Sequence, residues 1–166
     1  MNKNSENINK DVIIVDIDGT LSLMEGIRGP YDYDKVHLDK PNKPIIKLIK
    51  ILSTSKYTNI KIFIFSGRMN KKLKKPIKIN GINCFDTIQL TISWINEHLG
   101  RGFWDNIFLR EDLDFRCDRI IKKEMYEEHI KDKYNVLYVI DDRERVVNMW
   151  RDDLGLTTLQ VAKGDF

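Results

Sequence analysis

Two aspartates, Asp16 and Asp18, stand at the end of an apolar, β-branched run that begins at Asp11. Because their positions differ by two, both side chains can leave a strand on the same side. One carboxylate of such a pair can attack phosphorus, while the other protonates the leaving oxygen and then activates water. Gly19 lets the chain turn sharply beside the pair. For the acid–base role, we expect like charges and partial burial to raise the pKa of Asp18.

Side chains able to do chemistry also stand at the ends of three later apolar runs. The first run, 59–66, ends in Ser66 and is followed by Arg68, and the second, 106–110, ends in Arg110. The third, 135–141, ends in Asp141 and is followed by Asp142 and Arg143. Ligands of open α/β sheets bind at the carboxyl ends of the parallel strands. The sequence therefore predicts that acids, a hydroxyl and arginines meet at one sheet edge.

The elements that would position these side chains alternate along the chain. The runs predict strands at 11–18, 59–66, 106–110, 135–141 and 157–162, and the segments between them predict helices at 42–56, 86–99, 116–131 and 142–153. This pattern predicts an α/β fold, a Rossmann-like parallel sheet with helices on both faces. The short segment 22–40 predicts a small flap after the first strand. We expect a flexible tail at 1–10 and a single domain over 11–166.

The acids themselves predict a metal ion. Carboxylates that meet at one edge repel one another, and a divalent cation with oxygen ligands, Mg²⁺ above all, neutralises them best. We therefore expect Asp16, Asp18, Asp141 and Asp142 to hold Mg²⁺. Arginine forks and the Ser66 hydroxyl suit a phosphate, and the combination is typical of phosphoryl transfer.

Composition excludes other classes of protein. The 166 residues are 42% hydrophobic and 32% charged, which is typical of an ordinary globular domain. We expect no membrane segment and no signal peptide, and therefore a cytoplasmic protein. Cys84 and Cys117 are expected to be free thiols. No G-x-x-x-x-G-K-[ST] kinase loop occurs, and no pattern predicts an oligomeric state.

The motifs, in this order, resemble those of the haloacid dehalogenase-type phosphatases. The matching residues are Asp16-Ile17-Asp18-Gly19-Thr20, Ser66, Lys122 and Asp141-Asp142. The segments RGPYD (28–32), SGR (66–68), IDDR (140–143), VVNMWR (146–151) and GDF (164–166) narrow the resemblance to the phosphatase half of phage-type polynucleotide kinase-phosphatases. The resemblance runs from about residue 11 to the end of the chain. Two features depart from it: Ile27 is inserted between Gly26 and Arg28, and the lysine-rich stretch 70–80 has no clear counterpart.

The resemblance implies a Mg²⁺-dependent phosphatase that works through a phospho-aspartate. It implies that Asp16 is the nucleophile, that Asp18 is the acid–base, and that Lys122 shares the third motif with Asp118. The residues it implies for binding the phosphate are Arg28, Ser66, Arg68, Arg110 and Asp118. It places Asp141 and Asp142 in support of the metal.

We expect the enzyme to remove a 3′-phosphate from DNA or RNA ends, in the host cytoplasm if the protein is viral. The short flap would leave the site open to a polymer end. A small-molecule phosphatase such as a nucleotidase is the alternative. A second alternative, an inactive scaffold of the same fold, would have lost a key acid, and all of these acids are present.

Several other residues have competing interpretations. Lys71, Lys72, Lys74, Lys75 and Lys78 crowd a predicted basic loop, which is either a solvated face or a surface that attracts a nucleic-acid backbone. Tyr31, Tyr33 and Phe85 either stack on bases near a 3′ end or pack locally. The usual explanation for Asp118 and Lys122, four residues apart, is a solvated helix salt bridge. Arg143 would pair with an acid, the tryptophans would be core, and the three histidines show no ligand spacing.

Overall fold

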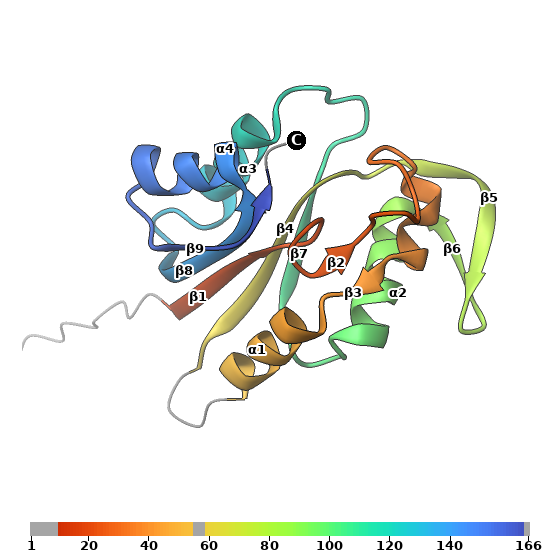
Figure 1. Cartoon of the computed structure of the whole chain (residues 1–166), viewed down its shortest axis with the longest axis horizontal. Coiled ribbons are helices and arrows are strands. Elements are labelled where there is room, and N and C mark those ends of the chain that lie inside the picture. The colour runs from red at the N-terminus through yellow and green to blue at the C-terminus, as the bar shows by residue number, and fades with distance from the viewer. Residues whose placement is uncertain (1–9, 55–58, 165–166) are drawn as a thin grey trace, which may run out of the picture.

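Five parallel strands form the centre of the molecule (Figure 1). The structure, a computed structural model, describes residues 10–54 and 59–164, so most of the expected tail lies outside the described residues. The strands are β1 (Lys10–Asp16), β4 (Lys61–Met69), β7 (Asn106–Arg110), β8 (Tyr134–Arg143) and β9 (Thr158–Gly164). Their order is β7-β4-β1-β8-β9, which places β1 between β4 and β8. The predicted parallel sheet is confirmed.

Helices cover both faces of this sheet, as the continuous apolar strands predicted. They are α1 (Lys43–Ser53), α2 (Thr87–His98), α3 (Asp118–His129), α4 (Glu144–Asn148) and a π-helical segment η2 (Met149–Asp153). Alternate residues of β1 enter two separate cores: Ile13 packs with residues of α1 and α2, and Ile14 packs with residues of α3, α4 and η2. The predicted helix 142–153 is thus two segments, and the predicted end of α1 at 55–56 lies outside the described residues.

The tryptophans anchor these cores, as expected. Trp94 of α2 and Trp150 of η2 are almost fully buried, one in each core, and Trp104 is partly buried against the first. The Trp94 indole also donates a hydrogen bond of 2.8 Å to the main-chain oxygen of Asp39, in the segment that follows β1. This contact ties that segment to α2.

The expected flap occupies the segment after β1. It contains β2 (Ser22–Leu23), a 3₁₀ helix η1 (Tyr33–Leu38) and β3 (Lys40–Pro41), with β2 and β3 paired antiparallel. Val36 of η1 is fully buried against Leu90 of α2. The flap is therefore small and packed, and it stands at the carboxyl end of β1.

The lysine-rich stretch forms a β-hairpin, so the expectation of a basic loop is wrong. Strand β5 (Lys72–Ile79) pairs antiparallel with β6 (Ile82–Asp86) through a turn in which Asn80 has φ 48° and Gly81 has φ 85°. Positive φ at both central residues is the geometry that two-residue hairpins favour. Leu73, Ile77 and Ile79 pack inward beside α2 and η1, which leaves the lysines facing water.

Two expectations about the remaining chain can be compared with the structure. Among the residues that the structure describes, no helix is both long and apolar enough to span a bilayer. Cys84 is buried, Cys117 is exposed, and both are free thiols, as the sequence analysis expected.

Candidate active site

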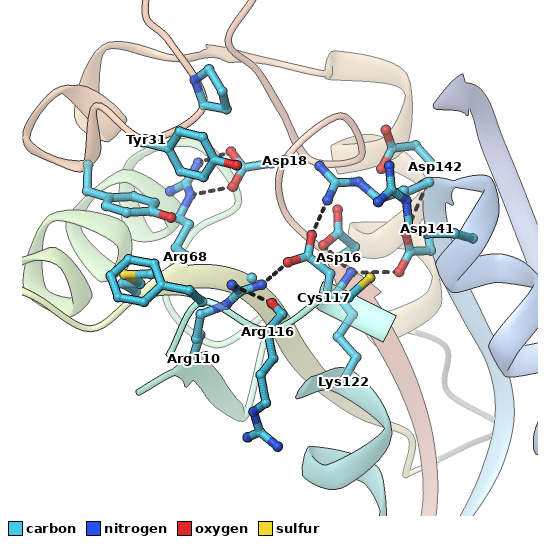
Figure 2. A pocket seen from close by; sticks show the side chains of 18 of the residues that line it. Asp16, Asp18, Tyr31, Arg68, Arg110, Arg116, Cys117, Lys122, Asp141 and Asp142 are labelled. Carbon is cyan, nitrogen blue, oxygen red and sulfur yellow. Dashed lines mark hydrogen bonds and ion pairs between the residues drawn. The ribbon is translucent and has the colours of Figure 1, made fainter. Parts of the chain in front are cut away.

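The carboxyl ends of β1, β4, β7 and β8 meet beneath one cavity of about 470 Å³ (Figure 2). Asp16 ends β1, Arg110 ends β7, and Asp141 and Asp142 lie near the end of β8. The predicted site residues that line the cavity are Asp16, Asp18, Arg68, Arg110, Asp118, Lys122, Asp141 and Asp142. The topology thus gathers residues that are far apart in the sequence, because parallel strands present the same ends at one edge.

Lys122 of α3 joins the acids of two neighbouring strands. Its Nζ lies 2.6 Å from Asp16 Oδ1 and 2.7 Å from Asp141 Oδ2, and its side chain is only 3% exposed. Burial alone would lower the pKa of this ammonium, but Asp141 and Asp16 raise it above its usual range. Lys122 therefore stays charged and pairs with these two acids, in place of the solvated salt bridge that its spacing from Asp118 suggested.

Three carboxylates at this edge form a possible metal site. Asp16, Asp141 and Asp142 each offer an oxygen, and these oxygens lie within 4.8 Å of one another. Asp16 Oδ2 is buried and has no hydrogen-bond partner among the described residues. Buried carboxylate oxygens require a partner, and a divalent cation with oxygen ligands would satisfy this one. The arrangement therefore fits a hard cation.

The pKa values of these acids also favour a bound cation. Burial raises the pKa of Asp16 to about 8 although Lys122 opposes the shift, and Asp141 and Asp142 add to it. Burial and the neighbouring Asp141 likewise raise the pKa of Asp142 to about 6. The carboxylates are therefore short of positive charge, which a bound cation would supply.

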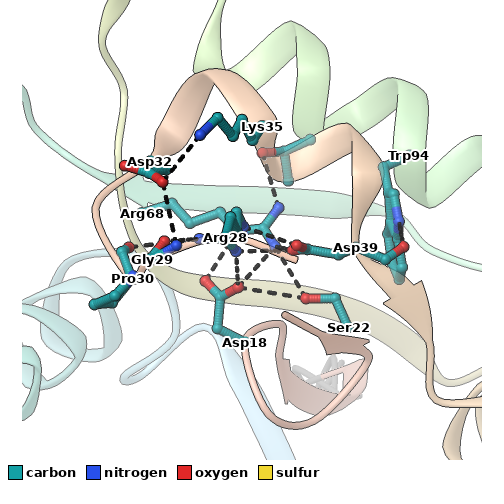
Figure 3. Close-up of polar contacts among 11 residues, drawn as sticks. Asp18, Ser22, Arg28, Gly29, Pro30, Asp32, Lys35, Asp39, Arg68 and Trp94 are labelled. Atoms are coloured by element: carbon teal, nitrogen blue, oxygen red, sulfur yellow. Dashed lines mark hydrogen bonds and ion pairs between the residues drawn. The ribbon is translucent and has the colours of Figure 1, made fainter. Parts of the chain in front are cut away.

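The Asp18 carboxylate is not part of this group of three. It accepts hydrogen bonds from Arg68 Nη2 at 2.7 Å, Arg68 Nε at 2.9 Å and Arg28 Nη2 at 2.6 Å (Figure 3). Burial would raise the pKa of Asp18, but the two guanidiniums outweigh it and lower the pKa to about 2. The expectation of a raised pKa is wrong, because it took account of neighbouring acids and not of the arginines.

Asp39 completes this second polar cluster, and no pattern in the sequence predicted it. Its Oδ1 lies 2.7 Å from Arg28 Nε, and its Oδ2 lies 2.8 Å from Arg68 Nη2, with all three side chains fully buried. Asp39 belongs to no motif and follows η1 in the flap. Charge balance is the signal that could have found it, because two buried arginines beside Asp18 require a second acid.

Arg28 and Ser66, both predicted to bind phosphate, are not among the residues that line the cavity. The Arg28 side chain is fully buried in the Asp18–Asp39 cluster, and its Nη1 also donates to the main-chain oxygen of Gly29 at 3.2 Å. Ser66 is fully buried, and its Oγ accepts a hydrogen bond of 3.2 Å from the main-chain nitrogen of Arg68. Both residues therefore hold the backbone around the site.

Asp118 holds two arginines at the opposite side of the acids. One of its carboxylate oxygens accepts from Arg110 and the other accepts from Arg143, which thereby pairs with an acid as expected. A Cβ at Gly67 would lie 2.8 Å from Asp118 Oδ1, so the glycine leaves room for this carboxylate. Asp118 thus fixes the directions of two cavity-lining guanidiniums.

A parallel sheet with a small flap after β1 and acids at its carboxyl edge is the arrangement expected of a haloacid dehalogenase-type phosphatase. Residues 10–166 match the family model described as "Polynucleotide kinase PNKP phosphatase domain". The chain belongs to this family of phosphatase domains, and it is a phosphatase.

Individual relatives agree with this family. The chain is 30% identical over 141 residues to a "Putative bifunctional polynucleotide kinase/RNA ligase" of Autographa californica nuclear polyhedrosis virus. The matched residues cover 84% of this chain and 18% of that protein. A structure of a Pnkp1/Rnl/Hen1 complex matches 100% of this chain and 50% of its own with 32% identity and a TM-score of 0.78. A structure of the Pnkp1/Rnl/Hen1 RNA repair complex matches over 95% of this chain and 44% of its own chain, with 34% identity and a TM-score of 0.77. The chain therefore spans half or less of the length of these relatives.

Gly19→Ala should disturb the acids more than the same change at a matched glycine. Gly19 has φ +89° and its added Cβ would lie 2.5 Å from Asp142 Cγ, whereas Gly81 has φ +85° and open space around it. Both substitutions carry the cost of a positive φ, but only the first displaces a buried carboxylate. We expect Gly19→Ala to unfold at lower urea and to lose most hydrolysis of p-nitrophenyl phosphate, while Gly81→Ala keeps its activity. Equal losses would argue against this close approach.

Asp39→Ala should unfold the protein more easily than a change at the neighbouring Asp32. Removing Asp39 leaves two buried arginines with Asp18 as their remaining acid in the cluster, a loss that costs about 3–5 kcal/mol in buried pairs. Asp32 is half-exposed and pairs with the exposed Lys35, so Asp32→Ala should lower the stability far less. Urea denaturation of the two variants measures the difference. Similar midpoints would contradict a structural role for Asp39.

Proposed function

We propose that this chain is a Mg²⁺-dependent polynucleotide 3′-phosphatase that works through a phospho-aspartate. The observation that carries the proposal is the unpartnered, buried oxygen of Asp16 beside Lys122, Asp141 and Asp142, at the floor of the cavity in the described part of the chain. Membership of the PNKP phosphatase family supports a nucleic-acid end as the substrate.

Asp16, Asp141 and Asp142 would hold the magnesium ion, which supplies positive charge to the phosphate oxygens. The pattern of acids in the sequence also predicted Asp18 as a metal ligand, but the Asp18 carboxylate is engaged by Arg28 and Arg68. We therefore assign the metal to three carboxylates. Lys122 pairs with Asp16 and Asp141 and so holds these two carboxylates in place.

The reaction begins at Asp16. One of its carboxylate oxygens forms a bond to phosphorus, the bond from phosphorus to the 3′ oxygen breaks, and that oxygen takes a proton from Asp18. In the second step, a water molecule attacks phosphorus and gives a proton to Asp18. The bond between phosphorus and the Asp16 oxygen breaks, so inorganic phosphate is released and the Asp16 carboxylate is restored. Because Arg68 lines the cavity, an incoming phosphate can draw its donors away from Asp18 and so raise the pKa of that acid.

The residues around the acids have two roles in this proposal: some bind the phosphate and others position those that do. Arg68, Arg110 and Lys122 line the cavity and are assigned to the phosphate. Asp118 positions Arg110 and Arg143, while the buried Arg28 and Ser66 position the flap and the end of β4. Arg28, Ser66 and Asp118 are therefore positioning residues in this proposal.

A substrate panel tests the proposal directly. The enzyme with Mg²⁺ should release phosphate from oligonucleotides of DNA or RNA that end in a 3′-phosphate, and chelation of the metal should stop the release. Asp16→Asn should abolish it, because an amide cannot form the phospho-aspartate. Brisk release from free nucleotides, with none from oligonucleotide ends, would instead favour the small-molecule phosphatase.

Magnesium should stabilise the fold more at pH 8 than at pH 5. Without metal, the folded-state pKa values of Asp16 and Asp142, about 8 and about 6, lie above the unfolded value of 3.8. The folded state then binds more protons than the unfolded state, so stability falls as pH rises through this window. Mg²⁺ binds the ionised acids, and thermal unfolding with and without Mg²⁺ should show the larger rise in Tm at pH 8. An equal rise at both pH values would contradict these shifts.

Lysines on the β5–β6 hairpin should contribute to binding of a nucleic-acid backbone. Lys72, Lys74 and Lys78 are exposed on β5, which begins three residues after the cavity-lining Met69. Replacing all three with Gln should weaken binding of a single-stranded oligonucleotide and make its salt dependence shallower. The log–log slope should fall by up to about 0.7 for each phosphate that the variant no longer neutralises.

The matched control removes the same number of positive charges at the opposite edge of the sheet, where the strands begin. Lys10, Lys131 and Lys133 are exposed near the amino ends of β1 and β8. The triple Gln variant of these lysines should keep the salt slope of the natural chain. Identical slopes for both triple variants would show that the hairpin is only a solvated face.

A further inference from the structure

The cavity is larger than a phosphate and its metal require, and its walls are of two kinds. One part is lined by the acids and cations described above. The cavity's other lining residues include the apolar and aromatic side chains of Met24, Pro30, Tyr31, Tyr33, Met69 and Phe115. The whole cavity, at about 470 Å³, falls in the range of small-molecule sites, so it has room for the group that carries the phosphate as well as for the phosphate.

Two of these aromatic side chains face water. Tyr31, in the flap, and Phe115, in the segment between β7 and α3, are each 77% exposed. Leaving a large aromatic surface in water forgoes the free energy that burial would give. The aromatic rings therefore contribute little to the core. Both line the same cavity as the acids, which suggests contact with a ligand, and Figure 2 shows the Tyr31 ring beside Asp18.

The turn that carries Tyr31 is held by the buried Arg28. Arg28 Nη1 donates to the main-chain oxygen of Gly29 at 3.2 Å, and the main-chain nitrogen of Gly29 donates to Asp32 at 3.2 Å (Figure 3). The Tyr31 ring packs edge-on against Tyr33, with ring centroids 6.5 Å apart. This exposed ring thus stands on a fixed support.

The segment that carries Phe115 is held in a similar way by Arg110. Arg110 Nη1 donates to the main-chain oxygens of Asp114 at 3.2 Å and Arg116 at 2.9 Å, on either side of the phenylalanine. Arg116 then pairs with Asp114 and Glu124 at 2.7 Å each. Two arginines that contact the acids of the site, Arg28 and Arg110, therefore also fix the segments that present the aromatic rings.

We propose that Tyr31 and Phe115 bind the base of the terminal nucleotide, so that the site recognises a nucleoside 3′-phosphate end through the faces of these rings. The proposal rests on the proposed function for the identity of the leaving group. Every base has a π-face, so stacking on aromatic rings selects a nucleotide without selecting its sequence. The main-chain segments that carry the rings are held in place before binding, so they lose little conformational entropy when a base arrives.

The test compares ends that differ only in the terminal base. One hexanucleotide carries a 3′-phosphate on an ordinary nucleotide, and its partner carries the phosphate on an abasic tetrahydrofuran residue. Binding is measured by fluorescence anisotropy with the Asp16→Asn protein, and KM and kcat are measured with the natural chain. We expect the ordinary end to bind about tenfold more tightly, as stacking of one base supports.

Variants of Tyr31 and Phe115 test whether these two residues cause the preference for an ordinary end. Tyr31→Ala and Phe115→Ala should each raise KM for the ordinary end about tenfold, with little change for the abasic end or for p-nitrophenyl phosphate. Tyr31→Phe and Phe115→Tyr keep the rings and should restore KM. Phe85→Ala is the matched control, because Phe85 is 56% exposed on β6 but is not among the residues that line the cavity.

The outcomes separate the base site from the proposed function. If ordinary and abasic ends bind equally, or if the two Ala variants keep the natural KM, the base site is refuted, while release of 3′-phosphate still supports the proposed function. If the rings give a base preference in binding but no 3′ end loses its phosphate, the proposed function fails and the base site stands. A base preference that the Ala variants remove and the ring-keeping variants restore supports the proposal.

Discussion

The contact of Lys122 with Asp16 and Asp141 is the constraint on which the site depends. Parallel strands bring acids from β1 and β8 to the same buried edge, where their repulsion would be costly. One ammonium from α3 compensates part of that charge, at 2.6 and 2.7 Å from the two carboxylates. Asp142 brings a third carboxylate to the same group, so the group still lacks positive charge, and a bound cation could supply it.

The neighbouring cluster is balanced by comparison. Asp18 and Asp39 face Arg28 and Arg68, so two acids meet two guanidiniums in a buried set of ion pairs. Together these residues link the end of β1, the flap and the end of β4. A balanced network stabilises a shape, whereas an unbalanced one attracts a ligand. The balanced cluster therefore holds the flap in place, and in the proposed reaction its two cavity-lining members, Asp18 and Arg68, would also meet the substrate.

Much of this arrangement was predictable from strand ends. Asp16, Asp141 and Asp142 follow continuous apolar runs, and such runs in parallel sheets place their carboxyl ends together. The hairpin was not predicted, because its lysines masked the alternation of Leu73, Ile77 and Ile79. Asp39 lies in no motif, and Phe115 follows no strand end. Their roles come from tertiary contacts, which local patterns do not encode.

The pairing of β1 with β8 has a consequence for biosynthesis. Asp16 is synthesised before Lys122, which lies 106 residues later, and before Asp141, which lies later still. A nascent chain would therefore carry the Asp16 carboxylate in water until α3 and β8 emerged and joined the sheet. The acids and Lys122 would then come together in one late step of folding, and the site would exist only from that step on.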